Sequence, residues 1–179
     1  MATKAKTKAS RAAERKSSRS QAANRKKASQ ASQSAVELLE QDHRQVEELF
    51  EQYDQLKADD ERKGDLVQKI CLALEIHAQI EEEIFYPKAR EATKDNDLID
   101  ESLVEHATVK SLISEIEEME VGDDLFDAKI RVLGEMVKHH IHEEEGELFP
   151  EIESAKIDLE AVGKELTERK EALLSEMQA

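Results

Sequence analysis

Two stretches of the chain repeat one arrangement of residues that can bind metal ions. Residues 77–87 read HAQIEEEIFYP and residues 140–150 read HIHEEEGELFP, so each has a histidine, a glutamate four residues later and a closing proline. The second stretch follows the first by 63 residues, and the same offset takes His43 to His106. The sequence therefore contains two copies of a unit that carries two histidines and one glutamate.

The types and spacing of these residues indicate a metal centre. Residues four apart on a helix share a face, so a histidine and the glutamate that follows it can point to one place. Such polar groups are costly to bury alone in an apolar face. A cation would neutralise the acids and occupy the imidazole nitrogens. We predict six metal ligands: His43, His77, Glu81, His106, His140 and Glu144.

Four imidazoles and two carboxylates are enough ligands for two metal ions, with the carboxylates bridging. This nitrogen and oxygen set suits iron, manganese or zinc rather than ions that prefer thiolates. The structural alternative for any one buried histidine is a hydrogen-bonded core residue.

Other metal motifs fit the sequence less well. The H-E-x-x-H motif of zinc proteases is absent. The E-x-x-H spacing of ferritin-like di-iron sites occurs only at Glu40 and His43, and the repeat does not copy it. Glu47, four residues after His43, is a weaker candidate ligand because its repeat partner is Lys110.

A competing pair lies beside the second repeat. His139 and Glu143 also have the spacing of four residues. The register of the repeat and the apolar stripe of that segment favour His140 instead, so we expect His139 and His142 at the surface. The acidic runs around these positions are expected to be mostly solvated, with one member turned inward.

The elements that must position these residues are four amphipathic helices. From residue 35 onward, apolar residues recur at spacings of three and four, and the pattern breaks at about 58–63, 93–97 and 120–124. We predict an all-α protein with an up-down-up-down four-helix bundle over residues 35–152. Pro87 should end or kink the second helix and Pro150 should close the fourth. Residues 153–179 are predicted to form a helical extension that packs on the outside.

Composition excludes several other classes. The 179 residues include only five glycines and two prolines, which argues against a sandwich or barrel of short strands. A single cysteine, Cys71, excludes an intramolecular disulfide framework. No apolar run approaches the roughly 18 residues of a membrane span, and no secretory signal is recognisable, so we expect a cytoplasmic protein.

Residues 1–34 form a basic arm on an otherwise acidic chain. They hold ten lysines and arginines and one acid, within a chain whose net charge is −16. They lack leucine, isoleucine, valine and phenylalanine, so we expect disorder. Lysine and arginine can neutralise nucleic-acid phosphates without reading sequence. The alternatives are a solubilising tail, or one that folds back on the acidic body.

The motif pattern resembles the hemerythrin-like HHE cation-binding domain over residues 35 to about 152. The resemblance implies a non-haem di-iron centre whose ligands are the six residues named above. Its oxygen-carrying members have a second histidine four residues after the one in the third helix, where this chain has Lys110. The carboxylate of the fourth helix also differs in spacing from that of the carriers. These departures argue against reversible oxygen carriage.

The functional hypothesis is a di-iron protein that reacts with or senses oxygen, peroxide or nitric oxide. Two iron ions are the expected cofactors, with manganese or zinc as alternatives. Peroxide decomposition, an activity associated with the family, is the enzymatic form of this hypothesis, and we assign no catalytic residue beyond the ligands. The alternative is a metal-buffering or structural bundle without turnover, tethered to nucleic acid by the basic arm.

Overall fold

The computed structural model describes residues 33–57, 60–93 and 96–177. Residues 1–32 lie outside this part. The prediction that the basic arm is disordered concerns these residues and therefore falls outside the described structure. The described residues form helices and no strand: α2 (Ala35–Asp54), α3 (Arg62–Ile80), η1 (Glu81–Phe85), α4 (Tyr86–Ala92), α5 (Asp97–Glu117), α6 (Phe126–Glu143), η2 (Glu144–Leu148), α7 (Phe149–Ser154) and α8 (Leu159–Met177).

The first helix begins at a capping box. The hydroxyl of Ser34 accepts a hydrogen bond from the Glu37 amide at 3.2 Å, and the Glu37 carboxylate accepts one from the Ser34 amide at 2.9 Å. This reciprocal pair satisfies amides that have no partner inside the helix. It fixes the start of α2 eight residues before His43, which sets the register of the first predicted ligand.

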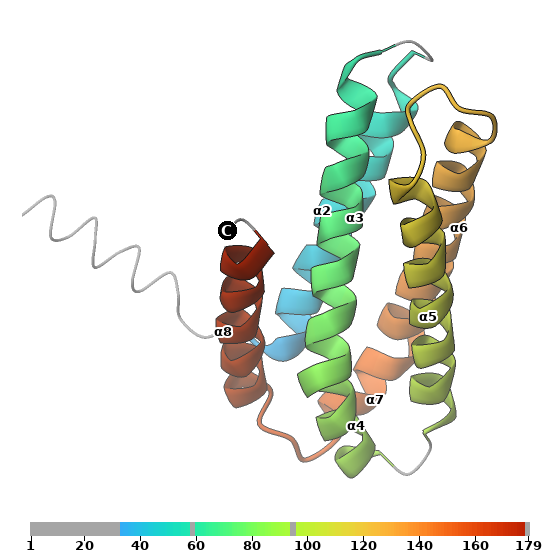
Figure 1. Cartoon of the computed structure of the whole chain (residues 1–179). Coiled ribbons are helices and arrows are strands. Elements are labelled where there is room, and N and C mark those ends of the chain that lie inside the picture. Colours follow the sequence, from blue (N-terminus) through green and yellow to red (C-terminus); the bar gives the residue numbers. More distant parts are fainter. Residues whose placement is uncertain (1–32, 58–59, 94–95, 178–179) are drawn as a thin grey trace, which may run out of the picture. The chain divides into compact units, whose positions relative to one another are not determined.

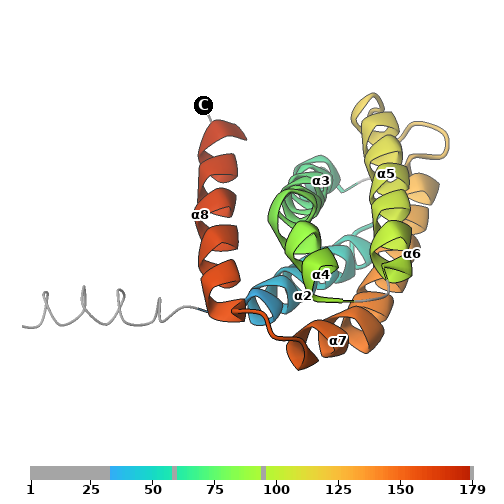
Figure 2. The same cartoon turned by 90° about the horizontal axis from the view of Figure 1, so that it is seen from below.

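Two helical hairpins form the bundle. α2 packs against α3, and α5 packs against α6, with the chain alternating in direction from one helix to the next (Figure 1). α8 lies against α2 and α3, on the side away from α5 and α6 (Figure 2). The prediction of an all-α four-helix bundle with an additional C-terminal helix is confirmed.

The second and fourth helices continue past their prolines, contrary to expectation for Pro150. Each passes through one π-helical turn, η1 or η2, which begins at Glu81 or Glu144. The amide of Tyr86 donates to the carbonyl of Glu81, five residues back. This wider turn comes just before the proline, which then lies in the first turn of α4 or α7, where its missing amide is tolerated.

The core consists of two apolar clusters with a polar layer between them. On α2, Leu39 belongs to one cluster and Val46 to the other, with His43 between them. On the other three bundle helices, too, the apolar residues before and after the predicted histidine belong to different clusters. The flanking pairs are Leu74 and Ile80, Ile99 and Val109, and Val137 and Leu148.

Within the described residues, no helix is both long enough and apolar enough to cross a membrane.

Candidate metal centre

The structure brings all six predicted ligands together inside the bundle. They occupy three positions of the repeat, each filled once in either copy, and every one is at least 94% buried. The histidines lie on α2, α3, α5 and α6, and the glutamates are the first residues of η1 and η2: His43, His77, His106, His140, Glu81 and Glu144.

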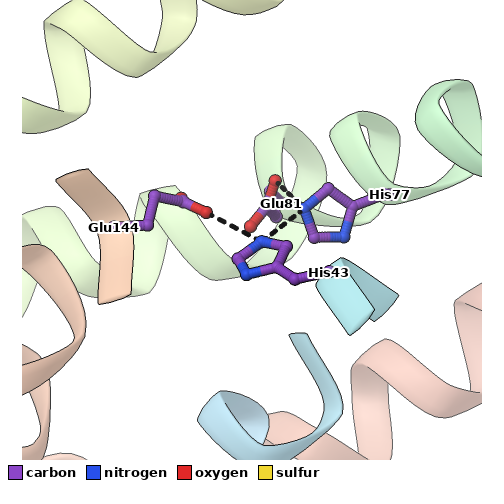
Figure 3. A group of neighbouring side chains, drawn as sticks. All are labelled: His43, His77, Glu81 and Glu144. Carbon is purple, nitrogen blue, oxygen red and sulfur yellow. Dashed lines mark hydrogen bonds and ion pairs between the residues drawn. The ribbon is translucent and has the colours of Figure 1, made fainter. Parts of the chain in front are cut away.

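Four of these side chains form the first group (Figure 3). The Nε2 atoms of His43 and His77 are 3.1 Å apart. Glu81 Oε2 lies 3.2 Å from His77 Nε2, and Glu144 Oε2 lies 3.2 Å from His43 Nε2. One hairpin therefore supplies both imidazoles and one carboxylate, while the other hairpin supplies the second carboxylate.

The second group repeats this geometry with the other hairpin. The Nε2 atoms of His106 and His140 are 3.1 Å apart, and Glu81 Oε2 lies 3.5 Å from His106 Nε2. Glu144 Oε2 lies 3.4 Å from His140 Nε2. Both carboxylates thus lie between the two pairs of imidazoles, as bridging ligands of a two-ion site would.

A second layer of carboxylates surrounds the imidazoles. Nδ1 of His43 lies 2.7 Å from Glu145, and Nδ1 of His106 lies 3.0 Å from Glu82. A carboxylate that accepts from Nδ1–H fixes the tautomer in which Nε2 is free for a metal. Glu82 and Glu145 are 63 residues apart, so the repeat extends to this layer.

The remaining two histidines have acidic neighbours at a different repeated position. Glu105 lies 2.8 Å from Nδ1 of His140, whereas Asp42 lies 3.8 Å from Nδ1 of His77, beyond hydrogen-bond distance. Sequence reasoning missed all four outer acids. The signal that could have found them is the 63-residue offset, which relates Asp42 to Glu105 and Glu82 to Glu145.

The electrostatics of the site call for a cation. Both oxygens of Glu81 and Oε2 of Glu144 are buried without a hydrogen-bond partner among the described residues. Burial and the charge of Glu144 raise the pKa of Glu81 well above its usual value. Burial alone would raise the pKa of Glu144, but the imidazoles of His140 and His43 lower it. Ionising both adjacent carboxylates is therefore energetically unfavourable unless a positive charge lies between them.

Two of the four imidazoles, those of His77 and His106, are in the neutral form that binds metal. Burial lowers the pKa of His77 to about 4 and also lowers the pKa of His106. Both rings are therefore neutral near pH 7, with a lone pair available. Imidazole nitrogens that face one another at 3.1 Å, beside carboxylate oxygens without a hydrogen-bond partner among the described residues, fit a metal ion of the nitrogen- and oxygen-binding type.

One further residue reaches the site without having been predicted. The hydroxyl of Tyr86 donates to Glu144 Oε1 at 2.8 Å and lies 3.4 Å from His106 Nε2. Burial and the charges of Glu144 and Glu81 raise the pKa of Tyr86 well above its usual value, so the phenol is neutral. Its repeat partner is Phe149, whose ring stacks on His43 with centroids 5.7 Å apart.

The competing candidates lie elsewhere. His139 is 60% exposed and contacts Glu105 and Glu143 at the surface. Glu47 pairs with Arg44 outside the bundle. The amine of Lys110 binds the outer carboxylate Glu82 at 2.6 Å and stays about two-fifths exposed.

Comparisons with known proteins agree with this architecture. The family described as the hemerythrin HHE cation binding domain matches residues 34–152. A hemerythrin HHE cation binding domain-containing protein of Mycobacterium kansasii has a similar crystal structure, with a TM-score of 0.69 and 24% identity. That likeness covers 79% of this chain and 87% of the other, and at this identity it supports the fold.

A second relative is described as a DNA nickase of Nostoc sp. It is 28% identical over 116 residues, which are 65% of this chain and 32% of the relative. This chain thus spans about a third of that relative's length. The family match covers most of this chain and includes the buried histidines and glutamates. The chain therefore belongs to the hemerythrin HHE cation-binding domain family.

Proposed function

We propose that this protein is a non-haem di-iron protein that reacts with or senses a small molecule such as oxygen, peroxide or nitric oxide. The observation that carries the proposal is the convergence of four Nε2 atoms on two buried carboxylates, three of whose four oxygens have no hydrogen-bond partner among the described residues. The six ligands are the residues named from the sequence: His43, His77, Glu81, His106, His140 and Glu144.

The donor set supports iron as the metal. Each group has two imidazoles, and both Glu81 Oε2 and Glu144 Oε2 lie within 3.5 Å of an Nε2 atom of each group, which suits iron, manganese or zinc. When bound, iron would supply redox chemistry and coordination positions for an exogenous ligand. The oxygen, peroxide or nitric oxide ligand is a proposal from the resemblance to the family.

The residues of this chain have three tasks in such a centre. The Nε2 atoms and the two inner glutamates hold the ions. The outer acids, such as Glu145 and Glu105, orient the rings through Nδ1. The apolar clusters on both sides of the layer keep bulk water away, which strengthens electrostatic interactions inside.

Metal analysis of the purified full chain tests this proposal. We expect two iron ions per chain and an optical spectrum that changes when azide or peroxide is added. Iron content without any spectral response to either would favour metal buffering instead. A chain that excludes iron when expressed with ample iron would contradict the proposal.

Contact with nucleic acid is the second candidate function. One relative is described as a DNA nickase, and the arm of this chain has ten basic residues in 34. Retention on DNA that falls steeply with salt and disappears without residues 1–34 would support a tether through the arm. Retention that persists after this truncation would assign DNA contact to another part of the chain.

A further inference from the structure

A smaller group of metal-binding side chains lies on the outside of the second hairpin. Glu105 of α5 and His139 and Glu143 of α6 each offer one donor atom, and these atoms lie within 4.8 Å of one another. His139 Nε2 is 3.2 Å from Glu143 Oε1 and 3.7 Å from Glu105 Oε1. Donors about 2.0–2.2 Å from a tetrahedral ion lie about 3.3–3.6 Å apart, so small side-chain movements would let one ion contact all three.

The two carboxylates of this group have no basic side chain beside them. Only a fifth of the Glu105 side chain and a quarter of the Glu143 side chain are exposed. In the described part of the chain, the ion-pair partners of these carboxylates are imidazoles, with no lysine or arginine among them. Neighbouring carboxylates that are partly withdrawn from water repel each other. A divalent cation bound to His139 would offset this repulsion.

The buried layer of the bundle holds Glu105 in position. Its Oε2 lies 2.8 Å from Nδ1 of His140, whose side chain is 93% buried, while Oε1 lies toward His139. A donor that is already fixed loses less conformational freedom when a ligand binds. Glu105 therefore contacts the proposed buried centre with one oxygen and leaves the other for the surface group.

The first hairpin has no equivalent of this group. The residues 63 positions before His139 and Glu143 are Ile76 and Ile80, which are buried in the apolar cluster that includes Leu166 of α8. α8 packs on α2 and α3 and has no comparable packing on α5 and α6. Where the first hairpin buries two isoleucines, the second therefore places a histidine and a glutamate, one helical turn apart, on an uncovered face.

We propose that Glu105, His139 and Glu143 form a separate, exchangeable site for a divalent transition-metal ion such as zinc. One imidazole and two carboxylates suit zinc, manganese or ferrous iron, whereas magnesium prefers a shell of oxygens. The His139 side chain is 60% exposed, so the bound ion remains in contact with water and exchanges readily. The site goes beyond the proposed di-iron function and does not depend on it, because it contains none of the six buried donors.

Zinc titration of the purified full chain, with equilibrium dialysis and metal analysis, tests the inference. The wild type should bind one more zinc ion per chain than His139→Ala, whatever metal fills the buried centre. In Glu143→Gln, which keeps the side-chain length, the Kd for this ion should rise roughly tenfold or more. Excess magnesium should not displace the ion. A mild chelator should remove it from the wild type, and the washed wild type and His139→Ala should then hold equal amounts of buried metal.

His142→Ala is the matched control. His142 is also exposed and also lies on α6, but the residue four positions later is Gly146, where His139 has Glu143. Its ring therefore has no glutamate one turn further along the same face. The number of zinc ions bound and their Kd should match those of the wild type.

Three results would overturn the inference. The first is equal zinc binding in the wild type and His139→Ala. The second is an equal loss in His139→Ala and His142→Ala, which would mean that the effect is not specific to this group. The third is displacement of the extra zinc by magnesium at similar concentration, which would indicate attraction to an acidic surface rather than coordination by an imidazole. The di-iron proposal would stand in each case, because iron content and the response to azide or peroxide decide it.

Discussion

The two hairpins share an inner set of donors but differ in what surrounds it. In the first hairpin, Asp42 stands 3.8 Å from the ring of His77, and in the second, Glu105 stands 2.8 Å from His140. Tyr86 is matched by Phe149. The comparison teaches that repeated positions build the proposed centre, whereas positions that differ make its two halves unequal.

The C-terminal helix adds to this inequality. α8 contacts α2 and α3, and it has no comparable packing on α5 and α6. Lys170 of α8 binds Asp42, and Arg169 binds Glu83 at 2.6 Å. The first hairpin therefore has an outer acid held by a neighbouring helix, and the acid of the second hairpin, Glu105, instead faces the exposed His139.

The largest expected effect comes from removing one imidazole in either half. His77→Ala and His140→Ala should each lose metal and thermal stability together, because binding favours the folded chain by mass action. Losing about 3 kcal/mol of this linkage would lower Tm by roughly 5–10 °C. Metal analysis and thermal melts measure both quantities. His139→Ala is the control, and equal losses in all three variants would refute the assignment.

A core substitution in α8 should separate stability from metal binding. Leu166 lies on α8 and is fully buried, so Leu166→Ala should cost about 2–5 kcal/mol in the free energy of unfolding. Metal content should stay unchanged, since no proposed ligand lies on α8. Urea unfolding measures the cost, with exposed Met177→Ala as a near-neutral control. Metal loss in Leu166→Ala would show that the first half depends on α8.

The pH dependence of Glu81→Gln should isolate one bridging carboxylate. In the metal-free chain the pKa of Glu81 is raised by burial and by Glu144, so its stabilising contribution is present below the unfolded pKa and lost as pH rises. Compared with wild type, metal-free Glu81→Gln should therefore gain stability from about pH 5 to about pH 8, by up to roughly 1.4 kcal/mol per unit.

Urea unfolding with a chelator at both pH values measures this difference. In the metal-loaded proteins the order should reverse, because glutamine is a poor bridging ligand. A metal-free difference that stays constant across the range would mean that Glu81 does not hold its proton in the folded chain.

The smallest expected effect concerns two basic side chains that lie outside the two halves of the proposed metal centre. Lys110 pairs with Glu82, and Arg44 pairs with both Glu145 and Glu47. Both pairs are partly exposed, so Lys110→Ala and Arg44→Ala should each change stability by about 1 kcal/mol or less, with less effect at high salt. Metal content should not change in either variant. A marked loss of metal from only one of them would reveal a further difference between the halves.

Much of the fold was readable from the sequence because helical periodicity and a fixed offset reinforce each other. Apolar residues at spacings of three and four located the four bundle helices. The 63-residue offset identified His43 and His106 as equivalent positions of the repeat. The structure gathers these side chains with both glutamates. Their assignment as metal ligands stays a prediction, since it concerns an ion.

The rest of the site depended on features that the helical period does not carry. Tyr86 follows Glu81 by five residues, a spacing that an α-helix places on a different face. The outer acids Glu82 and Glu145 lie within acidic runs, where composition alone indicates a solvated surface. The course of the chain past Pro150 also could not be predicted, because nothing in the local sequence distinguishes a π turn from a helix end.

Because of the π turns, the insertion or deletion of one residue would change which side chains lie next to the proposed metal centre. A π turn equals one residue inserted into an α-helix. Deleting one residue between Glu81 and Tyr86 would restore the α-helical period and rotate the following segment by about 100° about the helix axis. Another side chain would then face the site in place of Tyr86, although all six donors precede or lie apart from the change. A single-codon deletion could therefore alter what meets an incoming ligand while the inner donors stay the same.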